Sequence, residues 1–288
     1  MAKYLVHKAV DLVKVKVKRR AVLSQPGYLE SNYWVLKKYD GCCGIIHIDG
    51  EGKATQILTR TGEKIRSCDH ILNWITTDGH WRNVVLFVEL WHPDMDFSEI
   101  SGKVRQHKPA PELIYKAWDV VPLLDYYDGA CSVPFLERYG WMQANIHPDF
   151  LAYLYPFNPV SLVDEANVVR ASGPYDGLIA KDPNGTWKLG LGTGGESIKI
   201  KPPLSFDLEV VGTTEGEGKH EGRIGSLLVR FRAGVVLGIG TGLSDRDRLR
   251  DDWVGKIVEV EAMGYSSEGS LREPRLKGER FDKEQADF

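Results

Sequence analysis

Three lysines have the residue type and setting for phosphoryl chemistry. Lys38 opens the segment Lys-Tyr-Asp-Gly, and Lys199 and Lys201 lie beside a pair of prolines. A lysine amine attacks phosphorus only as the neutral base, although its ordinary pKa of about 10.4 keeps it protonated. Burial and neighbouring cations lower that pKa. Because Lys199 and Lys201 alternate along an expected strand, both should point to the same face. Taken alone, Lys38 followed by Asp40 is also what a charged surface turn contains.

Further segments follow Lys38 in an order that matches one superfamily. Lys38-Tyr39-Asp40-Gly41 resembles motif I of the nucleotidyltransferases, which include DNA ligases, RNA ligases and mRNA capping enzymes. Later segments resemble motifs Ia, III, IIIa, IV, V and VI of that superfamily, in this order: 59–62, 87–90, 118–119, 175–181, 199–202 and 280–283. The Arg-x-Asp-Lys form of the last segment is the ligase version, and residues 255–260 and 269–274 resemble the end of a ligase OB domain. Over nearly its whole length, the chain is similar to the minimal phage-type ATP-dependent DNA ligases.

The resemblance implies a three-step reaction. Lys38 would attack the α-phosphate of ATP, expel pyrophosphate and carry AMP as a phosphoramidate, assisted by Asp40. Lys199 and Lys201 would neutralise the α-phosphate. The AMP would then pass to the 5′-phosphate at a nick in duplex DNA, and the 3′-hydroxyl would displace it. Positioning and charge neutralisation would supply most of the rate.

The other matched residues receive roles from the same resemblance. Trp118 would stack on adenine, Glu89 would accept from a ribose hydroxyl, and Arg60 would bind ribose or the nick phosphate. Arg280 and Lys283 would come from a second domain to orient the departing pyrophosphate, so that domain closure is part of the reaction. The implied ATP or AMP contacts are Tyr39, Arg60, Glu89, Trp118, Lys181, Lys199, Lys201, Arg280 and Lys283.

A divalent cation is the implied cofactor beside ATP. Asp40 and Asp176, with Glu89, would supply the carboxylate oxygens that Mg²⁺ prefers, and Mn²⁺ is an alternative. A second acidic group, Asp245, Asp247, Asp251 and Asp252, is interleaved with arginines, which favours a charged helix surface over a metal site.

Two positions depart from the family pattern. The arginine that usually follows the motif I glycine by two residues is Cys43 here, and a thiol cannot replace a guanidinium that binds ribose or phosphate. Arg60 would cover part of the loss, or adenylation would be slower. Motif IV usually begins with glutamate, whereas Asp176 is one methylene shorter. These departures keep open a degenerate ligase that binds nicked DNA without sealing it.

The patterns predict an α+β chain of two domains. Residues 1–203 would form a nucleotidyltransferase (adenylation) domain with antiparallel sheets and flanking helices, and residues 204–288 a small C-terminal OB-fold β-barrel, divided by the Lys-Pro-Pro segment. In the first domain we expect strands at 33–36, 45–48, 55–59 and 84–90 and helices at 63–75, 133–142 and 161–171. In the second we expect strands at 207–212, 225–231, 235–239 and 256–263 and a helix at 244–253. The glycine-rich stretch 189–195 reads as a flexible loop without a P-loop ending.

The charge balance limits how the chain can bind nucleic acid. With a formal net charge of -3 and a pI of 6.3, bulk basicity is excluded, so any contact with phosphates must be local. Lysines and arginines alternate with valines over residues 13–20, which predicts a strand with one cationic face. The expected DNA contacts are Lys14, Lys16, Arg60, Lys219, Arg223, Arg230 and Arg232, of which the last two rest on alternation alone.

Cysteine spacing and hydropathy favour a cytoplasmic protein, in a bacterial host if the gene is carried by a phage. The four cysteines show no disulfide framework and no CxxC pair for zinc. The N-terminus lacks the apolar core of a signal peptide, and no window approaches the roughly 18 apolar residues of a membrane helix. We expect a monomer whose partners are ATP and nicked double-stranded DNA.

Two enzymatic alternatives use the same active site. An RNA ligase, or a ligase that tolerates RNA in one strand, would differ in its contacts with 2′-hydroxyl groups. A capping guanylyltransferase would use GTP, and the Arg-x-Asp-Lys tail weighs against it.

Overall fold

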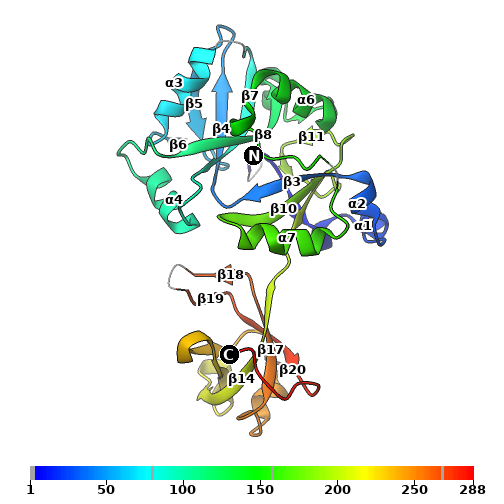
Figure 1. Ribbon diagram of the computed structural model, residues 1–288, viewed down its shortest axis with the longest axis vertical. Helices are drawn as coiled ribbons and strands as arrows, with labels where there is room; N and C mark the ends of the chain where they lie inside the picture. The colour runs from blue at the N-terminus through cyan, green and yellow to red at the C-terminus, as the bar shows by residue number, and fades with distance from the viewer. Residues whose placement is uncertain (1–3, 79–80, 157, 267–268) are drawn as a thin grey trace. The chain divides into compact units, whose positions relative to one another are not determined.

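The chain divides into two compact units, Met1–Lys201 and Pro202–Phe288. The computed structural model describes residues 4–78, 81–156, 158–266 and 269–288 (Figure 1). The division falls slightly before the predicted boundary after Pro203, within the same proline segment. Helices and strands are both present, and the predicted α+β class is confirmed.

A four-stranded sheet of the first unit carries the lysine segments. β10 (Tyr175–Lys181) lies at its centre and pairs antiparallel with β3 (Trp34–Tyr39) and β13 (Ser197–Ile200), and β13 pairs parallel with β2 (Val10–Asp11). The helices in this part of the unit are α1 (Val17–Leu23), α2 (Tyr28–Asn32) and α7 (Leu162–Ala171). Ser161 caps α7 by accepting from the backbone N–H of Asp164, as the sequence predicted.

A five-stranded antiparallel sheet forms the other half of the first unit. Its order is β6 (Lys64–Ile65), β5 (Ala54–Leu58), β4 (Cys42–Ile48), β7 (Val84–Trp91) and β8 (Ile114–Pro122). β7 reads Val-Val-Leu-Phe-Val-Glu-Leu-Trp. Its apolar side chains after Val84 are buried on both faces, which explains why the run lacks alternation. Helices around this sheet are α3 (Asp69–Asp78), α4 (Phe97–Arg105), α5 (Leu123–Asp128) and α6 (Phe135–Asn145).

Short strand pairs fasten the loops of the first unit. β1 (His7–Lys8) pairs parallel with β12 (Gly190–Leu191), and β9 (Ala130–Cys131) pairs with β11 (Trp187–Lys188). The glycine-rich stretch is therefore held by a strand pair, and the carbonyl of Gly195 also accepts from the hydroxyl of Tyr33 at 2.8 Å. Single 3-10 turns lie at Leu12–Lys14 and Pro148–Phe150.

The second unit is built on a five-stranded antiparallel sheet. Its order is β16 (Val236–Ile239), β15 (Ile224–Arg230), β14 (Leu204–Glu215), β17 (Ile257–Ala262) and β20 (Arg275–Glu279). A separate pair joins β18 (Gly264–Tyr265) to β19 (Leu271–Arg272), and 3-10 turns lie at Gly218–His220, Arg232–Gly234 and Asp247–Leu249. Leu208, Val229 and Trp253 belong to a core that this unit forms by itself.

Three predicted elements are wrong. Residues 13–20 form no cationic strand, because a 3-10 turn leads into α1. Val15, between the two, is buried, whereas Val13 and Val17 are exposed. Residues 63–75 do not form one helix, since Lys64 and Ile65 pair with β5 and the helix begins only at Asp69.

The third wrong element is the helix at 244–253. Only Asp247–Leu249 is helical, and the charged helix surface predicted there is absent from the described residues. Arg248 turns inward and donates to the carbonyl groups of Ile224, Gly225 and Gly240, and Trp253 packs into the core. Arg248 is therefore bound by carbonyl groups near the ends of strands and does not lie on the solvated helix face that the sequence predicted.

Candidate active site

The turn after Lys38 joins the two sheets of the first unit. β3 belongs to the four-stranded sheet and β4 to the five-stranded sheet, so the chain crosses between them at Asp40 and Gly41. A Cβ atom on Gly41 would lie 2.2 Å from the carbonyl oxygen of Leu90, so only glycine fits. This close approach explains the glycine of the Lys-x-Asp-Gly segment and brings Lys38 near Glu89 at the end of β7.

A β-bulge aims Asp176 at Lys38. In the β10–β3 ladder Tyr175 pairs with Tyr39 and Gly177 pairs with Lys38, so Asp176 is the extra residue. Its Oδ2 lies 2.6 Å from Lys38 Nζ, and its Oδ1 accepts from Lys201 Nζ. Gly177 has a φ of +112°, and a Cβ there would lie 2.3 Å from the carbonyl oxygen of Ile200. One carboxylate therefore joins lysines from two of the predicted motifs.

The charge state of Lys38 differs from the expectation for a nucleophile. Burial lowers the pKa of Lys38, but the carboxylates of Asp176 and then Glu89 and Asp40 outweigh it, so the pKa is raised. While Lys38 is paired with Asp176, its amine is therefore held in the protonated form. For Lys199 the balance is the reverse: burial lowers its pKa, Asp11 opposes that shift, and Lys38 adds to it. Lys199 is thus the lysine of the group whose pKa moves in the direction that the sequence argument expected of Lys38.

Glu89 is a half-buried carboxyl group beside Lys38. Burial raises its pKa to about 7, against the opposing charge of Lys38, and it accepts a hydrogen bond from the backbone of Gly41. Directly opposite it in the β4–β7 ladder stands Cys43, at the position where the resemblance leads one to expect arginine. Burial raises the pKa of the Cys43 thiol well above its ordinary value, with Glu89 adding to the shift and Arg60 opposing it. Arg60 is thus near enough to act on both groups.

Three carboxylates, those of Asp40, Glu89 and Asp176, surround Lys38 closely enough to act on its pKa. Within the part of the chain that the structure describes, no set of three or more His, Cys, Asp or Glu side chains forms a ready-made metal site. Aspartate oxygens remain the right donors for Mg²⁺, whose remaining ligands are commonly phosphate and water.

Tyr39 lies on the opposite face of β3 from Lys38, because side chains alternate along a strand. Its ring packs edge-on against Trp91 and Tyr175, and its side chain is buried. A direct side-chain contact between Tyr39 and a nucleotide held at Lys38 is therefore not supported.

Trp118 also sits on a bulge. In the β7–β8 ladder Phe87 pairs with Asp119 and Val88 with Ala117, which leaves Trp118 as the extra residue. Its ring stacks on Phe87 at 5.4 Å and is only partly buried, so it combines a core contact with some free surface.

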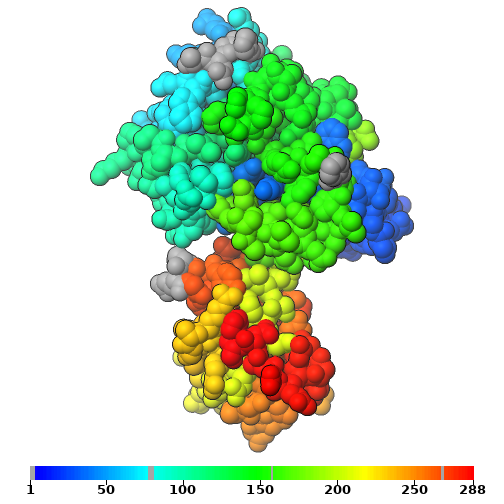
Figure 2. Space-filling model, viewed as in Figure 1, coloured from blue at the N-terminus to red at the C-terminus, as the bar shows by residue number. Residues whose placement is uncertain are grey.

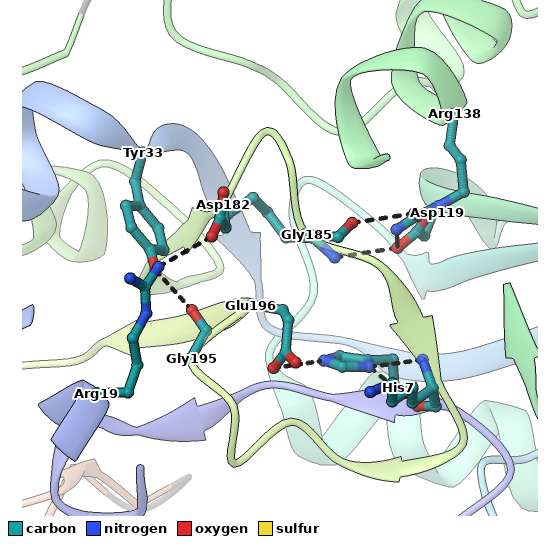
Figure 3. A network of polar contacts seen from close by, with 11 residues as sticks. His7, Arg19, Tyr33, Asp119, Arg138, Asp182, Gly185, Gly195 and Glu196 are labelled. Atoms are coloured by element: carbon teal, nitrogen blue, oxygen red, sulfur yellow. Dashed lines mark hydrogen bonds and ion pairs between the residues drawn. The ribbon is translucent and has the colours of Figure 1, made fainter. Parts of the chain in front are cut away.

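Asp119 is the centre of a buried ionic cluster (Figure 3). Arg138 donates to both of its carboxylate oxygens, at 2.8 and 3.1 Å, and Lys181 Nζ lies 3.1 Å from Oδ2. Despite complete burial, these two cations hold the pKa of Asp119 far below its ordinary range. Lys181, expected as a nucleotide contact, is thus engaged by Asp119 at the far end of β10 from Asp176.

In the second unit, both cations of the Arg-x-Asp-Lys segment meet one carboxylate. Arg280 Nη1 lies 2.7 Å from Asp207 Oδ1, and Lys283 Nζ lies 3.4 Å from Asp207 Oδ2. Arg280 also forms a two-pronged pair with Asp282.

Comparisons with known proteins agree with these features. Residues 215–280 match the model of the DNA ligase OB-like domain. The sequence is 29% identical over 219 residues to a DNA ligase of Methanothrix thermoacetophila, a match that spans 65% of this chain and 39% of that protein. A structure from a study of DNA binding by Lig E DNA ligases is 25% identical, covers 87% of this chain and 93% of its own, and has a TM-score of 0.62. The chain is similar to DNA ligases in sequence and in fold. The ATP-dependent DNA ligase of bacteriophage T7, solved with ATP, has the same fold, with 21% identity, coverage of 96% and 98%, and a TM-score of 0.55.

The predicted OB-type fold of the second domain is confirmed by the match over residues 215–280. The expected DNA contacts are exposed cations: Lys14, Lys16, Arg60, Lys219, Arg223, Arg230 and Arg232. Several have acidic or aromatic neighbours, since Lys14 pairs with Asp11 and the guanidinium of Arg232 lies 4.9 Å from the ring of Tyr265. Arg230 and Arg232 do not alternate on one strand, because β15 ends at Arg230 and a turn begins.

Sequence reasoning missed Arg138, although a signal was present. On α6 the buried side chains are Phe135, Arg138, Tyr139 and Met142, the spacing of an apolar helix face. An arginine on such a face must have a buried partner, and the aspartate of the Trp-Asp segment supplies it. Asp207, by contrast, lies on a strand with no sequence feature that singles it out.

In the described residues, no helix is long and apolar enough to span a membrane.

Proposed function

We propose that this protein is an ATP-dependent DNA ligase that seals 5′-phosphate/3′-hydroxyl nicks through AMP bound covalently to Lys38. The observation that carries the proposal is the group of Lys38, Asp176 and Lys201, brought together from three separate motifs by the bulge in β10. A charged surface turn would not require a glycine beneath it or a carboxylate aimed at the lysine.

The first step uses Lys38 as nucleophile and the α-phosphate of ATP as electrophile. Lys38 must first lose its proton, which the carboxylate of Asp176 opposes. Asp176 and Asp40 would hold a Mg²⁺ or Mn²⁺ ion, which neutralises charge on phosphate oxygens. With its carboxylate bound to that ion, Asp176 would no longer raise the pKa of Lys38. Lys201, released from Asp176, and Lys199 would then face the α-phosphate.

The remaining nucleotide contacts follow from position. Trp118 offers a partly free ring for adenine, Glu89 a carboxyl group for a ribose hydroxyl, and Arg60 a cation beside both Glu89 and Cys43. Arg280 and Lys283 would bind the departing pyrophosphate from the second unit. Exposed lysines and arginines would contact the DNA backbone, so binding should weaken as salt is raised.

The test is covalent labelling. Wild-type protein is incubated with a divalent metal salt and α-phosphate-labelled ATP, beside Lys38→Ala and Lys37→Ala variants. Lys37 is the matched control because it is the neighbouring lysine on the other face of β3, over the rings of Tyr153 and Tyr175. We expect acid-labile label on wild type and Lys37→Ala and none on Lys38→Ala, with ATP but not GTP.

The labelled protein is then given nicked duplexes. Sealing of an all-DNA nick supports the proposal, and sealing only of RNA-containing nicks would move the function to RNA. If protein first treated with pyrophosphate to remove bound AMP still takes no label, the enzymatic proposal fails. The protein would then be expected to bind nicked DNA without sealing it, and Cys43 and Asp176 would be the first residues to test as the reason for the lost activity.

A further inference from the structure

Every nitrogen group of the Arg280 guanidinium is engaged by a carboxylate. Nε and Nη2 donate to the two oxygens of Asp282, at 2.8 and 2.7 Å, and Nη1 donates to Oδ1 of Asp207 at 2.7 Å. Asp282 lies two residues away on an exposed turn, whereas Asp207 lies on β14 with a side chain only 11% exposed. Asp207, on the strand, is therefore the partner that holds Arg280 in place.

Asp207 also holds the second cation and the end of the chain. Its Oδ2 lies 3.4 Å from Lys283 Nζ, so each oxygen of the carboxylate faces a different cation. Its backbone N–H donates to Oδ2 of Asp287, and its carbonyl accepts from the N–H of Asp287, both at 2.8 Å. In Figure 2 the C-terminal segment, in red, lies on the surface of the second unit. A single strand residue thus fixes two surface cations and the segment that carries them.

This geometry suits a ligand with two adjacent anionic groups. The two cations are held on the two oxygens of one carboxylate, so both are presented together on the surface of the second unit. Charged hydrogen bonds from such cations to phosphate oxygens are strong and directional. We propose that Asp207 is a positioning residue that holds Arg280 and Lys283 for the β- and γ-phosphates of ATP. The inference rests on the proposed function, in which these two residues bind pyrophosphate. Asp207 itself does not touch the nucleotide.

The test compares ATP with AMP. Binding of each is measured by calorimetry in the Lys38→Ala protein, which cannot transfer AMP, with and without Asp207→Asn. Asparagine keeps the shape and one acceptor but loses the charge that orders both cations. We expect ATP to bind about tenfold more weakly in the Asp207→Asn protein, the order of one charged hydrogen bond, and AMP to bind equally well. Asp207→Glu should restore part of the ATP affinity.

The matched control is Glu261→Gln, which removes the surface pair between Glu261 and Lys277 in the same unit and should change neither affinity. Equal weakening of ATP and AMP, or a loss with Glu261→Gln as large as with Asp207→Asn, would show that Asp207 acts only on the stability of the unit and would overturn the proposal. Unchanged ATP affinity in Asp207→Asn would overturn it as well. These measurements need no turnover, so they are separate from a failure of wild-type protein to form lysyl-AMP.

A second readout separates the steps in the Lys38-containing protein. Asp207→Asn should slow the formation of lysyl-AMP while sealing of a nick that already carries AMP proceeds at the wild-type rate. Loss of both steps together would again point to a structural role and contradict the proposal.

Discussion

His7 is a buried histidine whose ring fastens the N-terminal strand to the rest of the first unit. Its Nδ1 lies 3.0 Å from the backbone nitrogen of Lys188 and 2.9 Å from the carbonyl oxygen of the same residue, and its Nε2 faces Glu196 at 3.8 Å (Figure 3). Burial, reinforced by the charge of Lys181, lowers the pKa of His7 to about 4. The folded chain therefore keeps this ring neutral at pH values where an unfolded chain would protonate it.

A pH-dependent stability contribution follows from that shift. Between the unfolded pKa of about 6.5 and the folded pKa of about 4, the unfolded state binds the extra proton, so the stability due to neutral His7 is lost as pH falls through this window. His7→Asn keeps an acceptor but cannot titrate. Its cost in free energy of unfolding should shrink by about 3 kcal/mol between pH 7 and pH 4. Urea denaturation at both pH values measures this.

The control for that experiment is His147→Asn, at an exposed histidine. A cost of His7→Asn that stays constant with pH, or one that His147→Asn reproduces, would contradict the account.

The residues of the candidate site could be predicted largely because their order along the chain is specific. Lys38, Asp176 and Lys201 come together as the resemblance implied. What the sequence could not reveal is their state: the raised pKa of Lys38 depends on three carboxylates whose distances only the fold sets. The engagement of Lys181 by Asp119 was hidden for the same reason.

At the level of elements, bulges place the side chains that matter most. Asp176 in β10 and Trp118 in β8 are both extra residues in otherwise regular ladders. A bulge points a side chain in a direction that it could not take if side chains alternated regularly along the strand. Bulges have no reliable sequence signature, so the prediction could name these residues but not explain how they would reach their partners.

Gly177 tests the bulge in β10. Gly177→Ala should lower the free energy of unfolding by about 2 kcal/mol or more, because its φ of +112° is unfavourable for alanine and its Cβ would meet the carbonyl oxygen of Ile200. Lysyl-AMP formation should fall with it, since Asp176 is displaced. Urea denaturation and ATP labelling measure the two effects.

Gly140→Ala is the matched control for Gly177→Ala. Gly140 lies in α6, where the methyl group of an alanine would meet no neighbouring side chain within 4 Å, so its replacement should raise stability by about 0.5 to 1 kcal/mol. A Gly177→Ala protein as stable as wild type would show that the bulge tolerates a side chain.

The predicted secondary structure is correct where the local sequence is compatible with one kind of element. It is wrong where contacts with a segment distant in the sequence determine which element forms. β7 was predicted because its short apolar run, broken only by Glu89, lacks helical spacing and fits a buried strand. Lys64 and Ile65 were predicted to be helical, but they pair with the edge of β5. The segment with alternating valines forms a turn and a helix instead of a strand, and only Val15 of its three valines is buried in the core. Local pattern cannot report such long-range choices.

At the scale of the molecule, the two units have separate hydrophobic cores. Units with their own cores are expected to unfold as separate cooperative blocks. Leu208→Ala, at a fully buried position of the second core, should destabilise that unit by about 2 to 5 kcal/mol and leave the first unit unchanged. Hydrogen exchange followed by mass spectrometry resolves the two.

Leu86→Ala, at a fully buried position of the first core, is the reciprocal control and should speed exchange only within Met1–Lys201. Faster exchange across both units in either variant would mean that they unfold together.

The crossing at Asp40 and Gly41 has a consequence for chain connectivity. β3 and β4 follow one another directly yet belong to different sheets, so this two-residue link ties Lys38, the proposed nucleophile, on one sheet to Glu89 on the other. A circular permutant opened at the hairpin between β4 and β5 would leave that link intact and should retain adenylation. One opened between Asp40 and Gly41 would keep every side chain but free Lys38 from the sheet that carries Glu89, and should lose adenylation while both sheets still form.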